Sequence, residues 1–164
     1  MSTSLDHLST SDVIDEFGDA AQSCDLQLRD FGGKTRFRGT IVTFRSPADN
    51  VILKTIVTEP GEGRVIIVDA GGSLRGAMLG DNMAEVAGAN GWAGLVINGV
   101  VRDSVALGRL TIGIKALGTN PRRSRKNGDG ERDIDVAFGG VVFRTGDHLV
   151  ADEDGVVVVA ATNS

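Results

Sequence analysis

The chain has 164 residues, a formal net charge of −5 at pH 7 and a sequence pI of about 5.0. This length fits one domain with one core, and the acidic balance argues against a binder of nucleic acid or anionic membrane, because both usually need a basic face. The single cysteine, Cys24, excludes an intrachain disulfide. No apolar run approaches the roughly 20 residues of a membrane span. We therefore expect a cytoplasmic protein.

The chain begins with a polar segment that has neither the basic nor the apolar region of a signal peptide. We therefore expect a flexible leader over residues 1–10, followed by a single domain over 11–164. An apolar stripe over 13–17 then predicts a short helix, and either Thr10 or Ser11 is a suitable cap for it.

Strands and turns follow in the next part of the chain. Residues 40–44 predict a strand, and the β-branched side chains within 51–57 favour a strand over a helix there. The short apolar run 65–68 predicts a buried strand. The glycine-rich run 70–73 predicts a turn, since glycine adopts positive φ at little cost.

The period of the apolar pattern becomes helical beyond residue 80. Apolar residues at i, i+3 and i+4 from Met83 predict a helix that Asp81 or Asn82 caps. Residues 95–97 predict the next strand, and Gly99 is expected to turn the chain after it.

Three charged residues stand out in this glycine-rich stretch: Asp81 at the helix start, and Arg102 and Asp103 after the strand. A helix followed by a returning strand brings its two ends to the same side of the layer, so we expect all three near the unpaired N–H groups of the helix start. An arginine and carboxylates there suit a small anionic ligand and a divalent metal. The alternative is that Asp81 is only a cap and that Arg102 and Asp103 form an ordinary ion pair in a turn.

The rest of the chain predicts a helical turn over 104–110, a strand over 111–117 and a basic loop over 118–132. The loop suits a phosphate or RNA patch, but the acidic total charge favours a solvated loop. Further strands are expected at 134–138, 141–143 and 156–160; the first two flank the hairpin turn Gly139-Gly140. His148 and Cys24 are expected to be structural.

A set of short motifs carries a resemblance to a known family: Gly71-Gly72-Ser73-Leu74, Gly80-Asp81, Gly91-Trp92-Ala93-Gly94, Asn98-Gly99, Arg102-Asp103 and Phe138-Gly139-Gly140-Val141. From about residue 10 on, the chain resembles the family of the regulator of ribonuclease E activity A, which is also that of the class II 4-hydroxy-4-methyl-2-oxoglutarate aldolases. It is similar to an actinobacterial branch whose members often carry an older label as menaquinone methyltransferase; the start of the chain has no glycine-rich cofactor loop after a first strand to support that label.

The resemblance implies an α/β fold: a layered α/β/β sandwich of the RraA-like, phosphohistidine-domain-like swivelling type, assembled as a ring-shaped homotrimer. It implies that Gly80, Asp81, Asn82 and Met83 bind substrate, that Arg102 contacts it, and that Asp103 holds Mg²⁺ or Mn²⁺ largely through waters. Asp81 and Arg102 are then the expected catalytic residues.

The function that the resemblance implies is metal-dependent cleavage of 4-hydroxy-4-methyl-2-oxoglutarate to two pyruvates, with oxaloacetate decarboxylation as a side activity. The longer aldolases place an acidic residue of a C-terminal extension in the neighbour's site, and this sequence ends at Ser164, so we expect decarboxylation to be better supported than aldol cleavage. The alternative is a non-catalytic regulator that binds and inhibits ribonuclease E.

Overall fold

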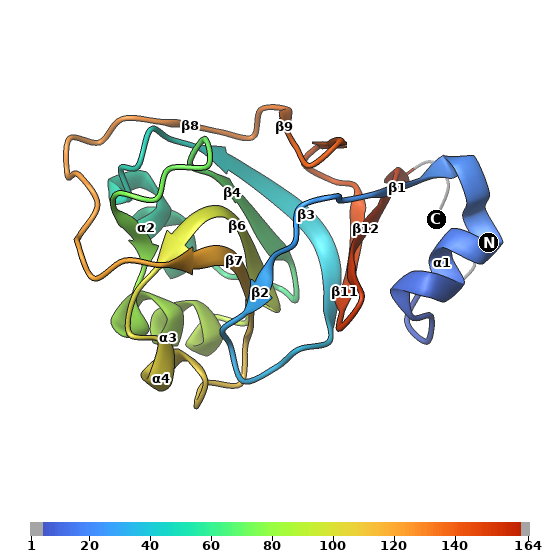
Figure 1. The fold of residues 1–164 in the computed structure, drawn as a ribbon, viewed down its shortest axis with the longest axis horizontal. Helices are drawn as coiled ribbons and strands as arrows, with labels where there is room; N and C mark the ends of the chain where they lie inside the picture. The colour runs from blue at the N-terminus through green and yellow to red at the C-terminus, as the bar shows by residue number, and fades with distance from the viewer. Residues whose placement is uncertain (1–4, 162–164) are drawn as a thin grey trace.

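The computed structural model describes residues 5–161, and a ten-stranded mixed sheet forms its centre (Figure 1). Four long strands lie side by side in the middle, in the order β3 (Phe37–Arg45), β4 (Val65–Asp69), β6 (Gly94–Val101) and β7 (Gly113–Thr119), and all three of these pairings are parallel. The short strand β5 (Ala77–Leu79) pairs with β6, also in parallel.

Antiparallel strands extend the sheet on both sides of this parallel centre. On one side, β11 (His148–Asp152) pairs with β3, β12 (Gly155–Val159) pairs with β11, and β1 (Ala21–Ser23) pairs with β12. On the other side, β2 (Arg29–Asp30) pairs with β7. The two remaining short elements are β8 (Glu131–Arg132), which pairs with β3, and the hairpin of β9 (Val136–Phe138) and β10 (Val141–Phe143).

Alternate residues of the central strands enter two separate cores, as the two-residue period of a strand requires. In β4, Ile66 and Val68 pack with the helices α2 (Val51–Thr58) and α3 (Asp81–Ala89), whereas Val65 and Ile67 pack with residues of β9 to β12. Every residue of β4 is buried. The central sheet is therefore covered on both faces, by helices on one and by strands on the other.

The N-terminal helix α1 (Thr10–Phe17) packs beside β1 and β12, far from α2 and α3 (Figure 1). It is followed by the short 3₁₀ helix Gly18–Ala20, and Ser9, not Thr10 or Ser11, caps it by accepting the N–H of Asp12 at 3.1 Å. Of the expected leader, residues 1–4 lie outside the described residues. Within the described part of the chain, no helix has both the length and the apolar character needed to cross a membrane.

Two further predictions about local structure were wrong. Residues 51–58 form helix α2, because Leu53, Ile56 and Val57 are spaced to bury one helical face, and this burial outweighs the β propensity of the side chains. Gly99 does not turn the chain but lies inside β6. A Cβ at Gly99 would lie 2.9 Å from the Cβ of Ala70, so the glycine permits close packing against the turn after β4.

Candidate functional site

The candidate site lies where β5 and β6 end beside each other. Leu79 pairs with Val101 at the last position of both strands, and the N–H of Arg102 continues the pairing by donating to the carbonyl of Leu79 at 3.0 Å. Gly80 and α3 follow β5, while Arg102, Asp103 and the short helix α4 (Ser104–Leu107) follow β6. The parallel register therefore places both chain segments at one edge of the sheet.

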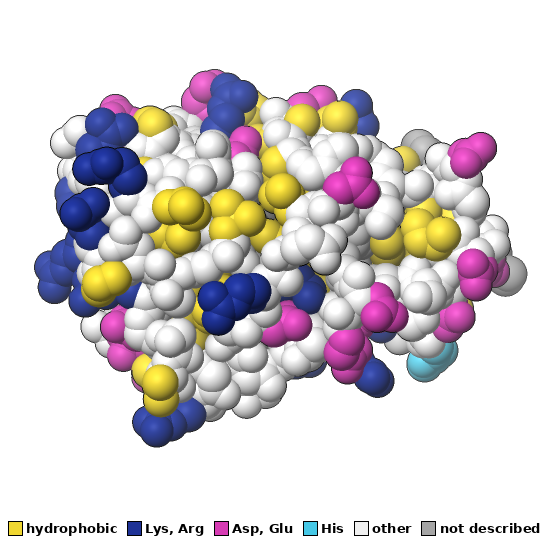
Figure 2. Space-filling model, in the orientation of Figure 1, with side chains coloured by type: hydrophobic (Ala, Val, Ile, Leu, Met, Phe, Trp, Pro, Cys, Tyr) yellow, Lys and Arg dark blue, Asp and Glu magenta, His cyan; other side chains and the backbone are white. Residues whose placement is uncertain are grey.

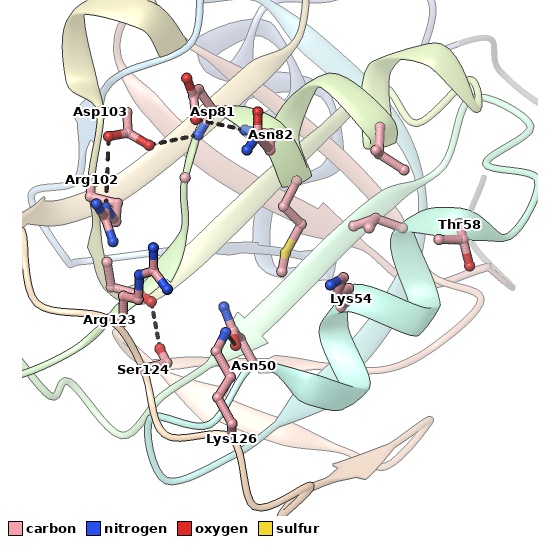
Figure 3. A pocket seen from close by; sticks show the side chains of 15 residues that line it. Asn50, Lys54, Thr58, Asp81, Asn82, Arg102, Asp103, Arg123, Ser124 and Lys126 are labelled. Carbon is pink, nitrogen blue, oxygen red and sulfur yellow. Dashed lines mark hydrogen bonds and ion pairs between the residues drawn. The ribbon is translucent and has the colours of Figure 1, made fainter.

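The predicted convergence of Asp81, Arg102 and Asp103 is present (Figure 3). Oδ2 of Asp103 accepts the backbone N–H of Asp81 at 3.0 Å, and Oδ1 of Asp103 lies 3.7 Å from Nε of Arg102. The predicted cap is wrong in detail: Gly80 occupies the N-cap position of α3, and the capping carboxylate comes from Asp103. Asp81 instead accepts the N–H of Asn82 at 2.8 Å.

Glycine at position 80 is required by this contact. A Cβ there would lie 2.8 Å from Oδ2 of Asp103 and 3.3 Å from Cγ of Arg102. Both side chains therefore pass directly over the backbone of Gly80, and any larger residue would displace them.

Asp103 has an unusual backbone conformation, with φ 60° and ψ 41° in the left-handed region. Such a conformation in a residue other than glycine costs free energy, about 1–3 kcal/mol, although aspartate adopts it more readily than most, and residues of this kind cluster at functional sites. Here it aims the side chain at α3, while the Asp103 carbonyl accepts the N–H of Leu107 at 2.9 Å and so starts α4.

The surroundings of Asp103 keep its carboxylate charged. The N–H of Asp81 lowers the pKa of Asp103 most, and the Asp81 side chain and the positive charge of Arg102 lower it further, against the opposing effect of burial. Asp103 is therefore an anion at neutral pH, next to a second carboxylate on Asp81.

A cavity of about 470 Å³ opens in front of these residues. It is lined in part by Gly80, Asp81, Asn82, Met83, Arg102 and Asp103, so it contains every site residue that the family resemblance implies. The rest of the lining comes from α2 and from the basic segment, which we define as residues 122–126. Its polar residues are Asn50, Lys54, Thr58, Arg123, Ser124 and Lys126; Arg123 lies beside Arg102, and Lys54 and Thr58 lie across the cavity (Figure 3). Four basic side chains and two carboxylates line the cavity, which suits an anionic ligand.

The contribution of the basic segment was not predicted, because the sequence favours a solvated loop there. Buried Asp49 fixes the end of this segment: its Oδ2 accepts the N–H groups of Asn127 at 2.6 Å and of Gly128 at 3.0 Å. Lys126 then donates to Oδ1 of Asn50. Burial and the nearby charges of Lys54 and Arg123 lower the pKa of Lys126. The one sequence signal for its role in lining the cavity is the basic composition of the loop.

The carboxylates of Asp81 and Asp103 suit a hard cation that keeps several of its waters better than a cation held by protein ligands alone. Among residues 5–161, no three His, Cys, Asp or Glu side chains form a group that could hold a metal ion. Mg²⁺ usually keeps several waters and uses only one or two carboxylates together with oxygens of the ligand. Asp103 and Asp81 supply such a pair beside a cavity with room for ligand and waters.

The two residues expected to be structural lie away from this cavity. His148 is half-buried in β11, where it pairs with Thr40 of β3 and Val159 of β12. Cys24 is buried, and that burial raises the pKa of its thiol. Neither residue lines the candidate site.

Residues 10–158 match the family described as RraA-like, Aldolase/RraA. The chain belongs to this family, and its mixed α/β fold agrees with that membership.

Solved structures show the same fold at substantial sequence identity. A protein from Geobacillus kaustophilus, described as S-adenosylmethionine:2-dimethylmenaquinone methyltransferase, is 42% identical with a TM-score of 0.92, and the match covers 93% of this chain and 95% of that one. The RNA-processing inhibitor RraA from Thermus thermophilus is 39% identical with a TM-score of 0.90, covering 93% and 92% of the two chains. RraAS2 from Streptomyces coelicolor, described as an unusual member of the RNase ES inhibitor family, is 27% identical with a TM-score of 0.77, covering 94% and 82%.

Proposed function

We propose that this protein is a divalent-metal-dependent lyase that cleaves 4-hydroxy-4-methyl-2-oxoglutarate to two pyruvates and also decarboxylates oxaloacetate. The observation that carries the proposal is the cavity in which Asp81, Arg102 and Asp103 face a second group of cations on α2 and the basic segment. A 2-oxo diacid has negative charge at both ends, and this cavity offers positive charge on both sides.

Arg102 and the start of α3 would hold the 2-oxo acid end of the substrate. The N–H groups of Asp81 and Asn82 already donate to Asp103 and Asp81, so the N–H of Met83 remains for a substrate carboxylate at the helix start. The guanidinium of Arg102 would stabilise the oxygen that becomes negative as the C–C bond breaks. Lys54, Arg123 and Lys126 would bind the distal carboxylate.

Asp81 and Asp103 would hold Mg²⁺ or Mn²⁺ through waters, and the bound cation would supply Lewis-acid stabilisation of the enolate. In the aldol reaction a water oriented by Asp81 accepts the proton of the C4 hydroxyl, the C3–C4 bond breaks, and one pyruvate leaves. In oxaloacetate the same bond breaks with release of CO₂. In both reactions the remaining enolate is protonated at C3 to give pyruvate, by a water that the Asp81 carboxylate orients.

The proposal is tested by measuring pyruvate formation from each substrate with Mg²⁺ or Mn²⁺ and then with EDTA. Arg102→Ala should lower turnover by about 10²–10³-fold, the usual loss for an oxyanion contact. Arg109→Ala is the matched control, because Arg109 is exposed and does not line the cavity. Activity that survives both EDTA and Arg102→Ala would rule out this mechanism.

A second candidate function is inhibition of ribonuclease E, which the descriptions of the Thermus and Streptomyces relatives suggest. Acidic side chains gather over α1 (Figure 2), including exposed Asp12, Asp15, Glu16 and Asp19, and would suit a basic segment of a partner. We expect this protein to capture ribonuclease E in a pull-down, and we expect added salt to weaken that capture. The Arg102→Ala variant should capture ribonuclease E equally well. Capture that is absent at low salt would exclude this function.

We also propose that the protein assembles as the ring-shaped homotrimer that the family resemblance implies. Light scattering coupled to size-exclusion chromatography tests this directly, because one chain has a mass of 17.1 kDa. A monomer at micromolar concentration would refute the trimer and leave the lyase proposal open to its own assay.

A further inference from the structure

A second cavity, of about 330 Å³, lies beside the basic segment; it adjoins the one that contains Asp81 and Asp103 and shares only Arg123 and Ser124 with it. Its lining includes four arginines and no carboxylate. The basic segment contributes Arg122, Arg123 and Arg125, the turn before β5 contributes Arg75, and the turn before α2 contributes Pro47 and Ala48. Dark blue side chains gather in Figure 2 along the margin where Figure 1 places the chain between β7 and β8.

These arginines have no acidic partner among the described residues. Arg122 donates to the carbonyl of Arg75 at 3.5 Å and Arg125 to the carbonyl of Pro47 at 2.7 Å, and both acceptors are neutral. The guanidinium groups of Arg75 and Arg123 make no hydrogen bond or ion pair with residues 5–161. All four arginines are exposed, and four guanidinium groups of one sign around one hollow in a chain with a net charge of −5 favour the binding of a multiply charged anion.

The backbone beneath the arginines is held in place by several contacts. The N–H of Ala77 donates to the carbonyl of Arg122 at 2.8 Å, and the N–H of Arg125 donates to the carbonyl of Ala48 at 3.0 Å. The side chain of Asn120 donates to the carbonyl of Leu74 at 2.7 Å. Three chain segments are thereby tied together, so the positions from which the arginines project are fixed before any ligand binds.

An adjoining cavity of about 430 Å³ shares Pro47, Ala48 and Ser73 with the arginine cavity and continues along Ala70 and Gly71. Its charged groups are already engaged: Arg45 pairs with Glu131 at 3.2 Å, and Oδ1 of Asp69 accepts the N–H of Gly71 at 2.9 Å. The combined hollow therefore has one strongly cationic end and one end without excess charge.

We propose that this hollow binds a phosphorylated small molecule with an organic body, such as a nucleoside diphosphate. The phosphates lie among the four arginines, because planar guanidinium groups bind phosphate oxygens in pairs. The organic body lies over Pro47 and Ala48 toward Ala70. The size of each cavity falls in the usual range for small-molecule sites. A compact hollow favours such a ligand over an RNA strand, which would need an extended basic track.

The test is isothermal titration of the full-length protein with ADP, pyrophosphate and adenosine at low salt. We expect saturable binding of ADP, weaker binding of pyrophosphate and none of adenosine. Arg75→Ala and Arg122→Ala should each weaken ADP binding at least about tenfold, as loss of one charged hydrogen-bond pair predicts. Arg75→Lys should give an intermediate loss, because lysine keeps the charge but lacks the planar fork.

Two control variants separate this site from others. Arg109→Ala removes an exposed arginine elsewhere and should leave ADP binding unchanged. Arg102→Ala should also leave it unchanged; loss of ADP binding in Arg102→Ala but not in Arg75→Ala would assign the ligand to the other cavity and overturn the proposal. Absence of saturable ADP binding would overturn it as well, as would adenosine binding equal to that of ADP. If a short RNA binds far more tightly than ADP, and Arg75→Ala and Arg122→Ala weaken that binding, the ligand of this hollow is RNA and the small-molecule proposal is wrong.

Discussion

The carboxylate of Asp103 caps the helix that begins at Asp81, with Oδ2 3.0 Å from the Asp81 nitrogen. One side chain therefore both fixes the start of α3 and presents its other oxygen toward Arg102. The geometry of the candidate site and the stability of α3 depend on the same contact.

This contact predicts a pH dependence of stability. The pKa of Asp103 is lowered in the folded protein, chiefly by the N–H of Asp81, so its ionised form stabilises the fold above the ordinary pKa of an aspartate, about 3.9. That stabilisation is lost as the pH falls through the lower folded value. Asp103→Asn tolerates the left-handed backbone but has no charge. Urea unfolding should show wild type more stable than Asp103→Asn at pH 7, with the difference shrinking on acidification; a constant difference would contradict this.

Gly80→Ala should impair the site more than the fold. The new Cβ would lie 2.8 Å from Oδ2 of Asp103 and would displace that carboxylate. We expect pyruvate formation from oxaloacetate to fall by up to about 10²-fold, because misplacing a reacting group by about 1 Å can cost that much. Gly88→Ala is the matched control: Gly88 lies in α3 with open space around it, so alanine there should raise the free energy of unfolding by about 0.5–1 kcal/mol and leave activity intact.

Lys126→Met should weaken substrate binding rather than slow the chemical step. Lys126 lies on the cavity side opposite Arg102, where it would bind the distal carboxylate. Steady-state kinetics with oxaloacetate should show KM raised about tenfold with kcat little changed, the pattern expected when a uniform binding contact is removed. Lys34→Met, at an exposed residue outside the cavity, should change neither constant. A lowered kcat with unchanged KM would instead place Lys126 in the chemistry.

Asp49→Ala should loosen the basic segment without removing any group that lines a cavity. Its buried carboxylate accepts the N–H groups of Val51, Asn127 and Gly128. Loss of these bonds should lower the free energy of unfolding by about 1.5–3 kcal/mol, the usual contribution of hydrogen bonds to a charged group. KM for oxaloacetate should rise as well, because Arg123 and Lys126 lose their fixed positions. Unchanged KM in a folded Asp49→Ala variant would show that the segment is held by other contacts.

The convergence of Asp81, Arg102 and Asp103 was predictable because a strand, a helix and a returning strand bring their ends to one edge of a sheet. The helix cap was not, because Asp81 is a good cap by local rules, whereas the actual cap lies 22 residues further along the chain. Likewise, no local pattern connects Asp49 with Asn127, although that contact brings the basic segment to the cavity. The strand predicted at 51–57 failed for a related reason, since the packing of one helical face outweighed local propensity.

Arg102 and Asp103 directly follow β6, a strand with neighbours on both sides and nearly every residue buried. Such a strand opens only when the whole domain unfolds. Heating should therefore abolish turnover and tertiary structure in a single cooperative transition, with no partly inactivated species at lower temperature.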